Sequence, residues 1–585
     1  MRKVIPFVIL FLIVLVVVLV SCVKQPESVP IRAIVTPAAG MRPSWVGICE
    51  NNDYEPFPPN SNYARWKNCS HEELEWDLIE PTDQNFSWSW LDPWITRVDS
   101  YGWYPSIAFS SQAWSPGQSG SSLFLPADLQ EPADEGTYYM TCSGVKIPKY
   151  WRSEYLTQMT QLSTAMADHI QNDAEGQKIK SVVIPLGNFG ELSIHYVQFW
   201  PCILAEMSAD SVSGHLSHLG VTCAAGGCTI DDGAAIWNES AQNIIGVWHD
   251  AFDAIARDVI LTVSTTNYSF RNWTRREVAA YARSLGIGAS HNKLTEDMGE
   301  SVVIPKGNDE GHWGSWDPIL DGQGEVFTFG YAIDSSSGDG FPLNPPHDTN
   351  LIEQQYWSFF NAIDAGMSRV INNFESSTAT WRYPFYTMQY TNTQVAEVMD
   401  IFLDVAGTDM SNTPYVLSTL RETQETNAYQ RSRCGNFEHG LEQKMCGVPA
   451  SFCAPPDYPA PAGGCSVPVW DAIPERTCTG DGVYQGSFDI NCDPRGRFAR
   501  RTDPATGNYR MFFDVDDEFA FGDNNITVEV TYADIGTDTI EVECTNISGN
   551  RVFDRKAKTN THAWITQEFT LDSCNLSNVQ QSVSD

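Results

Sequence analysis

Short apolar runs alternate with longer amphipathic stretches between residues 43 and 429. Runs of this length are typical of buried strands, and apolar positions spaced three and four apart are typical of helices. The predicted strands are Trp45–Cys49, Leu74–Ile79, Pro105–Ser110, Ser181–Leu186, Val259–Ser264, Gly286–Ser290, Val326–Ala332 and Arg369–Phe374. The predicted helices are Leu91–Tyr101, Ser153–Asn172, Glu239–Ala256, Arg275–Leu285 and Leu351–Gly366.

Eight strands that alternate with helices predict an α/β fold, a (β/α)8 TIM barrel, over residues 43–429. The alternative is an open doubly wound sheet. The strand number and the absence of a Gly-x-Gly-x-x-Gly fingerprint argue against that alternative. The long inserts at 111–150 and 192–236 are expected to lie as loops over the active face.

The pattern changes after the barrel. Residues 430–495 carry six cysteines and many Pro and Gly, which predicts a disulfide-stapled, Cys-rich connector. From residue 496 to 585, apolar and polar residues alternate over Tyr509–Asp514, Ile526–Tyr532, Ile540–Cys544 and Ala563–Leu571. Alternation broken by turns predicts a C-terminal β-sandwich of jelly-roll type, which serves as a glycan-binding module or a spacer.

The N-terminus predicts export. A basic Met1-Arg-Lys start and an apolar run to Val20 are typical of a signal peptide, expected over residues 1–21. The sequence Leu19-Val-Ser-Cys22 resembles a bacterial lipobox, in which the cysteine is lipidated. Residues 22–42 then form a tether from the lipid to the body. The alternative is an uncleaved membrane-spanning helix, and either arrangement leaves the body outside the cytoplasmic membrane.

Cysteine usage agrees with an oxidising compartment. Of 15 cysteines, 14 remain when Cys22 is set aside, enough for seven disulfides. Pairing of near neighbours predicts Cys49–Cys69, Cys142–Cys202, Cys223–Cys228, Cys434–Cys446, Cys453–Cys465, Cys478–Cys492 and Cys544–Cys574. No metal site is expected, because paired Cys-x-x-Cys and His-Glu-x-x-His motifs are absent.

Net charge and composition limit the classes of molecule that the protein is expected to bind. A formal net charge of −37 leaves no basic stripe for phosphates and excludes nucleic acid. The 19 tryptophans suit either a large core or a cleft in which flat rings stack on sugars.

Glu191 is the leading candidate for chemistry. It follows the predicted strand Ser181–Leu186 through a Gly-flanked turn. Parallel barrels carry their chemistry at the carboxyl ends of their strands, where a half-buried Glu can protonate a leaving group. The alternative is that Glu191 only caps the next helix.

One segment resembles a known family. It reads Tyr63-Ala-Arg-Trp-Lys, then Glu73-Leu-Glu-Trp-Asp-Leu-Ile-Glu-Pro-Thr, then Phe86-Ser-Trp-Ser-Trp-Leu-Asp92. This resembles the second barrel unit of clan A glycoside hydrolases, near the family 42 β-galactosidases. The resemblance covers roughly residues 43–400.

The resemblance implies retaining hydrolysis of β-linked glycosides by two carboxylates. Glu191 matches the acid/base after strand 4, although the family's preceding Asn is Gly190 here and Asn188 lies three residues back. Arg65 matches the Arg that keeps the nucleophile ionised. Its alternative role is a surface ion pair.

The nucleophile is expected after strand 7, where the chain has no Glu at the predicted exit. Three interpretations stay open: Glu325 serves, Glu375 after strand 8 serves, or the nucleophile is absent and the barrel only binds sugar. Other polar and aromatic side chains near strand exits are candidates for substrate binding or for loop packing: Asn267, His291, Asn292, Trp381 and Trp114.

The sequence therefore predicts a surface-anchored retaining glycoside hydrolase whose partners are an oligo- or polysaccharide substrate and, through its lipid, a membrane. No cofactor is expected. The alternatives are a non-catalytic glycan-binding lipoprotein with a degenerate barrel, and a structural surface protein.

Overall fold

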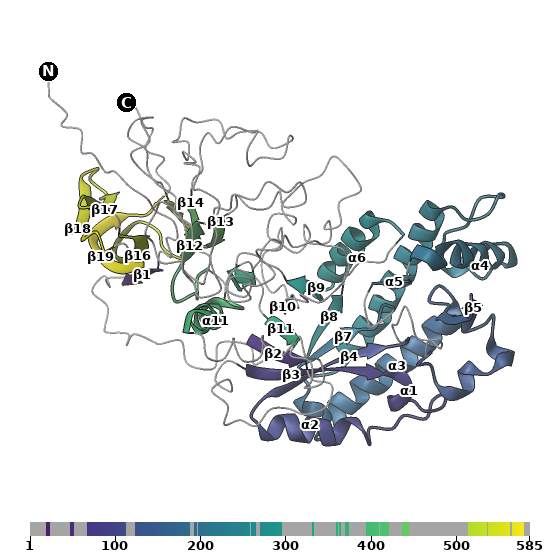
Figure 1. Cartoon of the computed structure of the whole chain (residues 1–585). Helices are drawn as coiled ribbons and strands as arrows, with labels where there is room; N and C mark the ends of the chain where they lie inside the picture. The colour runs from purple at the N-terminus through teal and green to yellow at the C-terminus, as the bar shows by residue number, and fades with distance from the viewer. Residues whose placement is uncertain are drawn as a thin grey trace.

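The computed structural model describes residues 19–23, 47–51, 67–112, 123–187, 192–195, 197–257, 259–264, 270–294, 330–332, 359–360, 362–363, 369–373, 393–408, 410–420, 436–443, 513–534, 536–561 and 564–577. Figure 1 shows an α/β body built from the purple to teal part of the chain and a strand-rich C-terminal part in yellow.

A curled sheet of parallel strands forms the α/β body. Its strands are β2 (Gly47–Asn51), β3 (Lys67–Glu75), β4 (Tyr104–Ser110), β7 (Ser181–Ile184), β8 (Ile260–Ser264), β9 (Gly288–Leu294), β10 (Gly330–Ala332) and β11 (Arg369–Asn373). Neighbours pair in the order β10-β11-β2-β3-β4-β7-β8-β9, and β10 also pairs with β9, so the pairs close into a ring. The prediction of a curled, parallel α/β sheet that fits a barrel is confirmed. A complete (β/α)8 barrel, with a helix after every strand, stays a prediction, because several connections lie outside the described residues.

Helices lie outside these strands (Figure 1). They include α2 (Leu91–Ser100), α3 (Ser153–Asn172), α5 (Ile230–Asp253), α6 (Asn272–Ser284) and α11 (Thr393–Val405). In α3, the buried residues Tyr155, Met159, Leu162 and Met166 recur every three or four positions, which places them on one face. The sheet meets this layer through side chains such as Phe109 of β4, whose ring lies 5.9 Å from that of Trp248 in α5.

The predicted second strand, Leu74–Ile79, is wrong. The strand runs from Lys67 to Glu75, and Trp76–Ile79 form the short helix α1. A search for apolar runs does not find this strand, because it buries the polar side chains of Ser70, His71 and Glu72. The backbone turns after Glu75, where the amide of Glu80 donates to the carbonyl of Trp76 over 2.9 Å.

The two long inserts contain elements of their own. The first contains the hairpin β5 (Tyr139–Cys142) and β6 (Val145–Pro148), and the second contains α4 (Trp200–Ser213). The disulfide Cys142–Cys202 joins the hairpin to α4. A covalent bond between two inserts restrains both, so neither is the simple loop that the sequence predicted.

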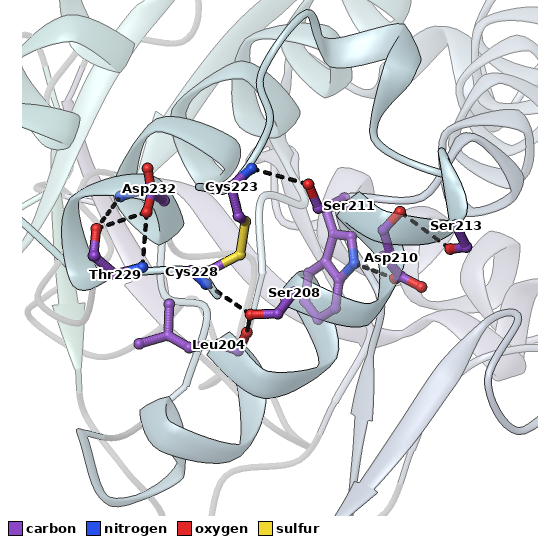
Figure 2. Close-up of a disulfide and its surroundings, with 10 residues drawn as sticks. Leu204, Ser208, Asp210, Ser211, Ser213, Cys223, Cys228, Thr229 and Asp232 are labelled. Atoms are coloured by element: carbon purple, nitrogen blue, oxygen red, sulfur yellow. Dashed lines mark hydrogen bonds between the residues drawn. A yellow bond between two sulfur atoms is a disulfide. The ribbon is translucent and has the colours of Figure 1, made fainter. Parts of the chain in front are cut away.

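A second disulfide, Cys223–Cys228, closes the turn between α4 and α5 (Figure 2). Hydroxyls on α4 hold this turn: Ser211 accepts from the amide of Cys223 over 2.9 Å, and Ser208 accepts from that of Cys228 over 2.7 Å. Helix α5 begins directly afterwards with a capping box between Thr229 and Asp232.

The C-terminal part contains β16 (Asp523–Ala533), β17 (Thr539–Thr545), β18 (Arg551–Ala557) and β19 (Trp564–Asn575). Strand β16 pairs antiparallel with β19 and with β1 (Leu19–Val23), while β17 pairs with β18. Both sheets contribute to one apolar core, and Cys544–Cys574 joins them. The strand-rich character is confirmed, whereas jelly-roll topology stays a prediction.

Four predicted disulfides are confirmed, and the other three lie outside the described residues. Most of the predicted Cys-rich connector also lies outside. Its described part forms β13 (Asn436–His439), which pairs with β12 (Leu417–Leu420), and β14 (Leu441–Gln443), which pairs with β15 (Phe513–Val515). Within the described ranges, no helix combines the length and the apolarity needed to cross a membrane.

Candidate active site at the barrel mouth

One hydrogen bond defines the inner face of the ring of strands. Arg369 of β11 donates from Nη1 to the hydroxyl of Ser106 in β4 over 3.3 Å. Strands β2 and β3 lie between β11 and β4 in the ring, so this bond crosses the lumen. Because side chains alternate along a strand, every second residue from Ser106 or from its registered partners also faces the lumen.

The lower lumen is polar. The hydroxyl of Ser106 lies 3.0 Å from Nδ1 of His71 in β3 and 2.9 Å from the hydroxyl of Ser181 in β7. Burial and the neighbouring charge of Arg369 lower the pKa of His71 to about 3. Burial lowers the pKa of Arg369 to about 10, which leaves it charged at neutral pH. The floor of the barrel therefore combines a neutral imidazole with one buried cation.

Two carboxylates rise above this floor on β3. Glu73 and Glu75 follow His71 at two-residue steps, and their registered neighbours on β4 are Ala108 and Ser110. Alternation therefore turns both toward the lumen. Glu73 is half-buried and Glu75 is exposed. Partial desolvation of the carboxylate, reinforced by the negative charge of Asp77, raises the pKa of Glu75. The sequence pattern did not indicate either residue as a lumen group, because the predicted strand, Leu74–Ile79, lies too far along the chain.

The chain around Glu191 is anchored at the same end of the sheet. The last residue of β7 is Ile184, and Glu191 follows by seven residues. The backbone N–H of its neighbour Leu192 donates a hydrogen bond over 2.7 Å to the carbonyl of Ser264, the last residue of β8. On the other side, Gly187 accepts from Ser111 over 3.5 Å. The described residues on either side of Glu191 in the chain, Gly187 and Leu192, therefore lie beside the carboxyl ends of strands.

An aromatic group packs beyond Glu191. His195 is buried, its ring lies 4.4 Å from that of Phe199, and burial lowers its pKa to about 4. The indole N–H of Trp200 donates to the carbonyl of His195 over 3.0 Å, and its ring lies 5.0 Å from Phe270 after β8. These contacts join the loops that follow β7 and β8. These contacts could not be predicted from the sequence, because the aromatic residues are isolated within a segment that was predicted to be a loop.

A buried cluster of charged side chains links α4 to the residues that precede α3. Asp210 of α4 accepts from the indole N–H of Trp151 over 2.7 Å and from Nε of Arg152 over 2.9 Å. The second oxygen of Asp210 also binds the guanidinium of Arg152, which makes the pair bidentate. Lys149 pairs with Glu206 on the same helix, and its Nζ lies 3.7 Å from the Asp210 carboxylate. These contacts hold α4 against the start of α3.

The Glu-Pro part of the family-like segment has a structural role. Glu80 accepts from the indole N–H of Trp76 over 2.8 Å and from the amide of Gln84 over 2.7 Å. Burial raises the pKa of Glu80 to about 7. Its two oxygens tie α1 to the turn that follows, which fixes the carboxyl end of β3.

Most predicted site residues lie outside the described residues. These are Glu191, Glu325, Glu375, Arg65, Asn188, Asn267, Trp381 and Trp114. The backbone of His291 and Asn292 belongs to β9, and Cys22 belongs to β1. Strand β10 begins at Gly330, so Glu325 precedes it by five residues, whereas Glu375 follows the last residue of β11, Asn373, by two. Arg65 precedes the first residue of β3, Lys67.

Comparison with family models finds no match, and comparison with curated proteins finds none either. Solved structures with a similar chain course include a β-galactosidase from the psychrophilic Marinomonas ef1, with a TM-score of 0.38, 12% identity and coverage of 62% of this chain. The chain spans 59% of the length of that protein.

Two xylanases are also similar. Xylanase 10C from Cellvibrio japonicus, in complex with xylopentaose, has a TM-score of 0.34 and 12% identity over 63% of this chain and 69% of its own. The endo-1,4-β-xylanase XylE of Penicillium canescens has a TM-score of 0.36 and 10% identity over 61% of this chain and 94% of its own. All three of these proteins are named as glycoside hydrolases.

Proposed function

We propose that this protein is a retaining glycoside hydrolase that acts on β-linked glycosides. The observation that supports it most is the chain position of Glu191, between Gly187 and Leu192, which bind residues at the carboxyl ends of β4 and β8, the two neighbours of β7. Chemistry in parallel barrels lies at that end of the sheet.

In the proposed reaction, Glu191 acts as the general acid and then as the general base. It gives its proton to the departing glycosidic oxygen while a second carboxylate attacks the anomeric carbon and the bond to the leaving group breaks. Water then attacks the glycosyl-enzyme ester, Glu191 removes the proton of that water, and the sugar leaves with its original configuration. The two carboxylates must lie about 5–5.5 Å apart.

The nucleophile in this proposal is Glu325 or Glu375. Their positions differ relative to the strands: Glu375 follows β11, at the carboxyl end of the sheet, whereas Glu325 precedes β10. The chemistry belongs at the carboxyl end, so the proposal favours Glu375.

The decisive variant is Glu191→Gln, which keeps the size of the side chain and removes its proton. Release of sugar from natural glycosides should fall by at least about a hundredfold, in line with general acid catalysis. A variant that keeps full turnover on natural and activated glycosides overturns the assignment.

A non-catalytic glycan-binding protein is the second candidate. It is favoured by β10, whose residues Gly330, Tyr331 and Ala332 include no carboxylate. Release of sugar that depends on Glu191 eliminates this candidate.

The proposal includes attachment to a membrane through a lipid on Cys22, with the body outside the cytoplasmic membrane. Four disulfides support an oxidising compartment. Fractionation of cells that express the Cys22→Ser variant tests the anchor: the protein should leave the membrane fraction, and unchanged membrane retention contradicts lipidation.

A further inference from the structure

One row of residues runs along the inner wall of the barrel, directly above its polar floor. Register places Glu73 of β3 beside Ala108 of β4, Ala108 beside Val183 of β7, and Val183 beside Thr262 of β8. The next neighbour of Thr262 is Gly288 of β9. The row lies two residues above the floor row of His71, Ser106 and Ser181, so it faces the lumen as well.

Two of the five positions in this row, Ala108 and Gly288, carry little or no side chain. A barrel of this kind normally fills each lumen layer with bulky branched side chains. Here Val183 is the one branched apolar side chain, while Ala108 contributes one methyl group and Gly288 contributes no side chain. Glu73 and Thr262 place polar atoms in the same layer of the lumen.

Thr262 gives an independent indication of a ligand. The residue is fully buried, and its hydroxyl has no hydrogen-bond partner among the described residues. Leaving a buried hydroxyl unsatisfied is unfavourable, and valine has the same shape without this cost. A hydroxyl that faces the lumen without a protein partner is suited to a ligand that carries its own donors and acceptors.

Glu73 complements that hydroxyl. It is half-buried in the same row, and an ionised carboxylate accepts hydrogen bonds at both oxygens. Adjacent hydroxyls of a pyranose present two such donors. A uronic acid would instead bring a third negative charge next to Glu73 and Glu75, which disfavours acidic sugars.

We propose that Glu73 and Thr262 form a hydroxyl-binding site for a neutral sugar ring at the base of the barrel mouth. Glu73 accepts from sugar hydroxyls, and the Thr262 hydroxyl exchanges a hydrogen bond with the same ring. This inference rests on the proposed carbohydrate function and names the sugar class and two residues that contact it.

The test uses a matched pair of variants. Thr262→Val removes the lumen hydroxyl. Thr274→Val in α6 is the control, because Thr274 is also fully buried and its hydroxyl also has no partner among the described residues. Both variants should keep the melting temperature of the wild type or raise it, because each removes an unsatisfied buried group.

Only the lumen variants should weaken sugar recognition. With 4-nitrophenyl β-galactoside and xylopentaose as probes, Thr262→Val should raise KM or the dissociation constant about tenfold, and Glu73→Gln should do so by about tenfold to a hundredfold. Thr262→Ser should restore most of the loss because it restores the hydroxyl. Binding is measured in the Glu191→Gln background, so that it does not depend on turnover.

The outcomes separate this inference from the proposed function. If Glu191→Gln abolishes turnover while Thr262→Val and Glu73→Gln behave like Thr274→Val, only the hydroxyl-binding site is overturned. If Glu191→Gln retains turnover while the lumen variants lose sugar binding, the site stands and the assigned acid/base is wrong. If the wild type neither binds nor cleaves either probe, both fail.

Discussion

Acid should destabilise the barrel through His71. The side chain is 2% exposed and lies 3.0 Å from Ser106, beside the charge of Arg369. Its pKa is about 3 in the folded chain against an ordinary 6.5. At pH 5, about 97% of unfolded chains but about 1% of folded chains then carry the proton.

The unfolded state therefore binds more protons, and stability falls as pH drops from about 6.5 toward 3. Between pH 7 and pH 5 the contribution of His71 to the free energy of unfolding falls by about 2 kcal/mol. His195 and His439, whose pKa values are also lowered by burial to about 4, act in the same direction. The wild-type loss alone thus cannot be assigned to one histidine.

His71→Asn isolates the effect, because an amide can meet the Ser106 hydroxyl but does not titrate. Urea unfolding at pH 7 and pH 5, followed by tryptophan fluorescence, gives the loss for each protein. The wild type should lose about 2 kcal/mol more than the variant. Equal losses in the two proteins would falsify the assignment of a neutral buried imidazole.

Two further predictions concern stability. Replacing Cys49 and Cys69 with Ala should lower the free energy of unfolding by about 3 kcal/mol, because the pair closes a segment with a separation of 20 residues; a melting temperature equal to that of the oxidised wild type contradicts this. Asp210→Ala should cost about 3–5 kcal/mol because it removes the bidentate carboxylate partner of the buried Arg152. The control Glu154→Ala should cost under about 1 kcal/mol, because its ion pair with Arg152 is partly exposed. Chemical denaturation compares these two variants, and similar losses would count against the special role of Asp210.

Sequence patterns located the apolar strands well and the helices only in part, because α5 begins at Ile230, nine residues before the predicted Glu239, and α4 was not predicted. Ser181–Ile184 and Ile260–Ser264 are buried throughout, so their apolar runs were visible, and the predicted helix Ser153–Asn172 has the observed bounds. Strand β3 was misplaced because its lumen face carries His71 and carboxylates, which an apolar criterion rejects. Strand β18 was missed for a similar reason: Arg551–Ala557 alternates exposed and half-buried residues and carries several charges.

The candidate site was only partly predictable. Glu191 could be proposed from its place after an apolar strand, which needs only local sequence. The lumen row of Glu73 and Thr262 depends on register across four strands, and no local pattern carries that information. The pairing of Cys49 with Cys69 was found by proximity in sequence, whereas its role as a link between neighbouring barrel strands required the fold.

The most direct measurement of the central claim is product analysis of the Glu191→Ala variant in the presence of azide. An activated 2,4-dinitrophenyl β-glycoside needs little help from an acid, so the variant should still form the glycosyl-enzyme ester but hydrolyse it slowly. Azide, which needs no general base, should then restore turnover and yield a β-glycosyl azide, detected by NMR. Turnover at the wild-type level, with no glycosyl azide formed, would contradict the role of Glu191.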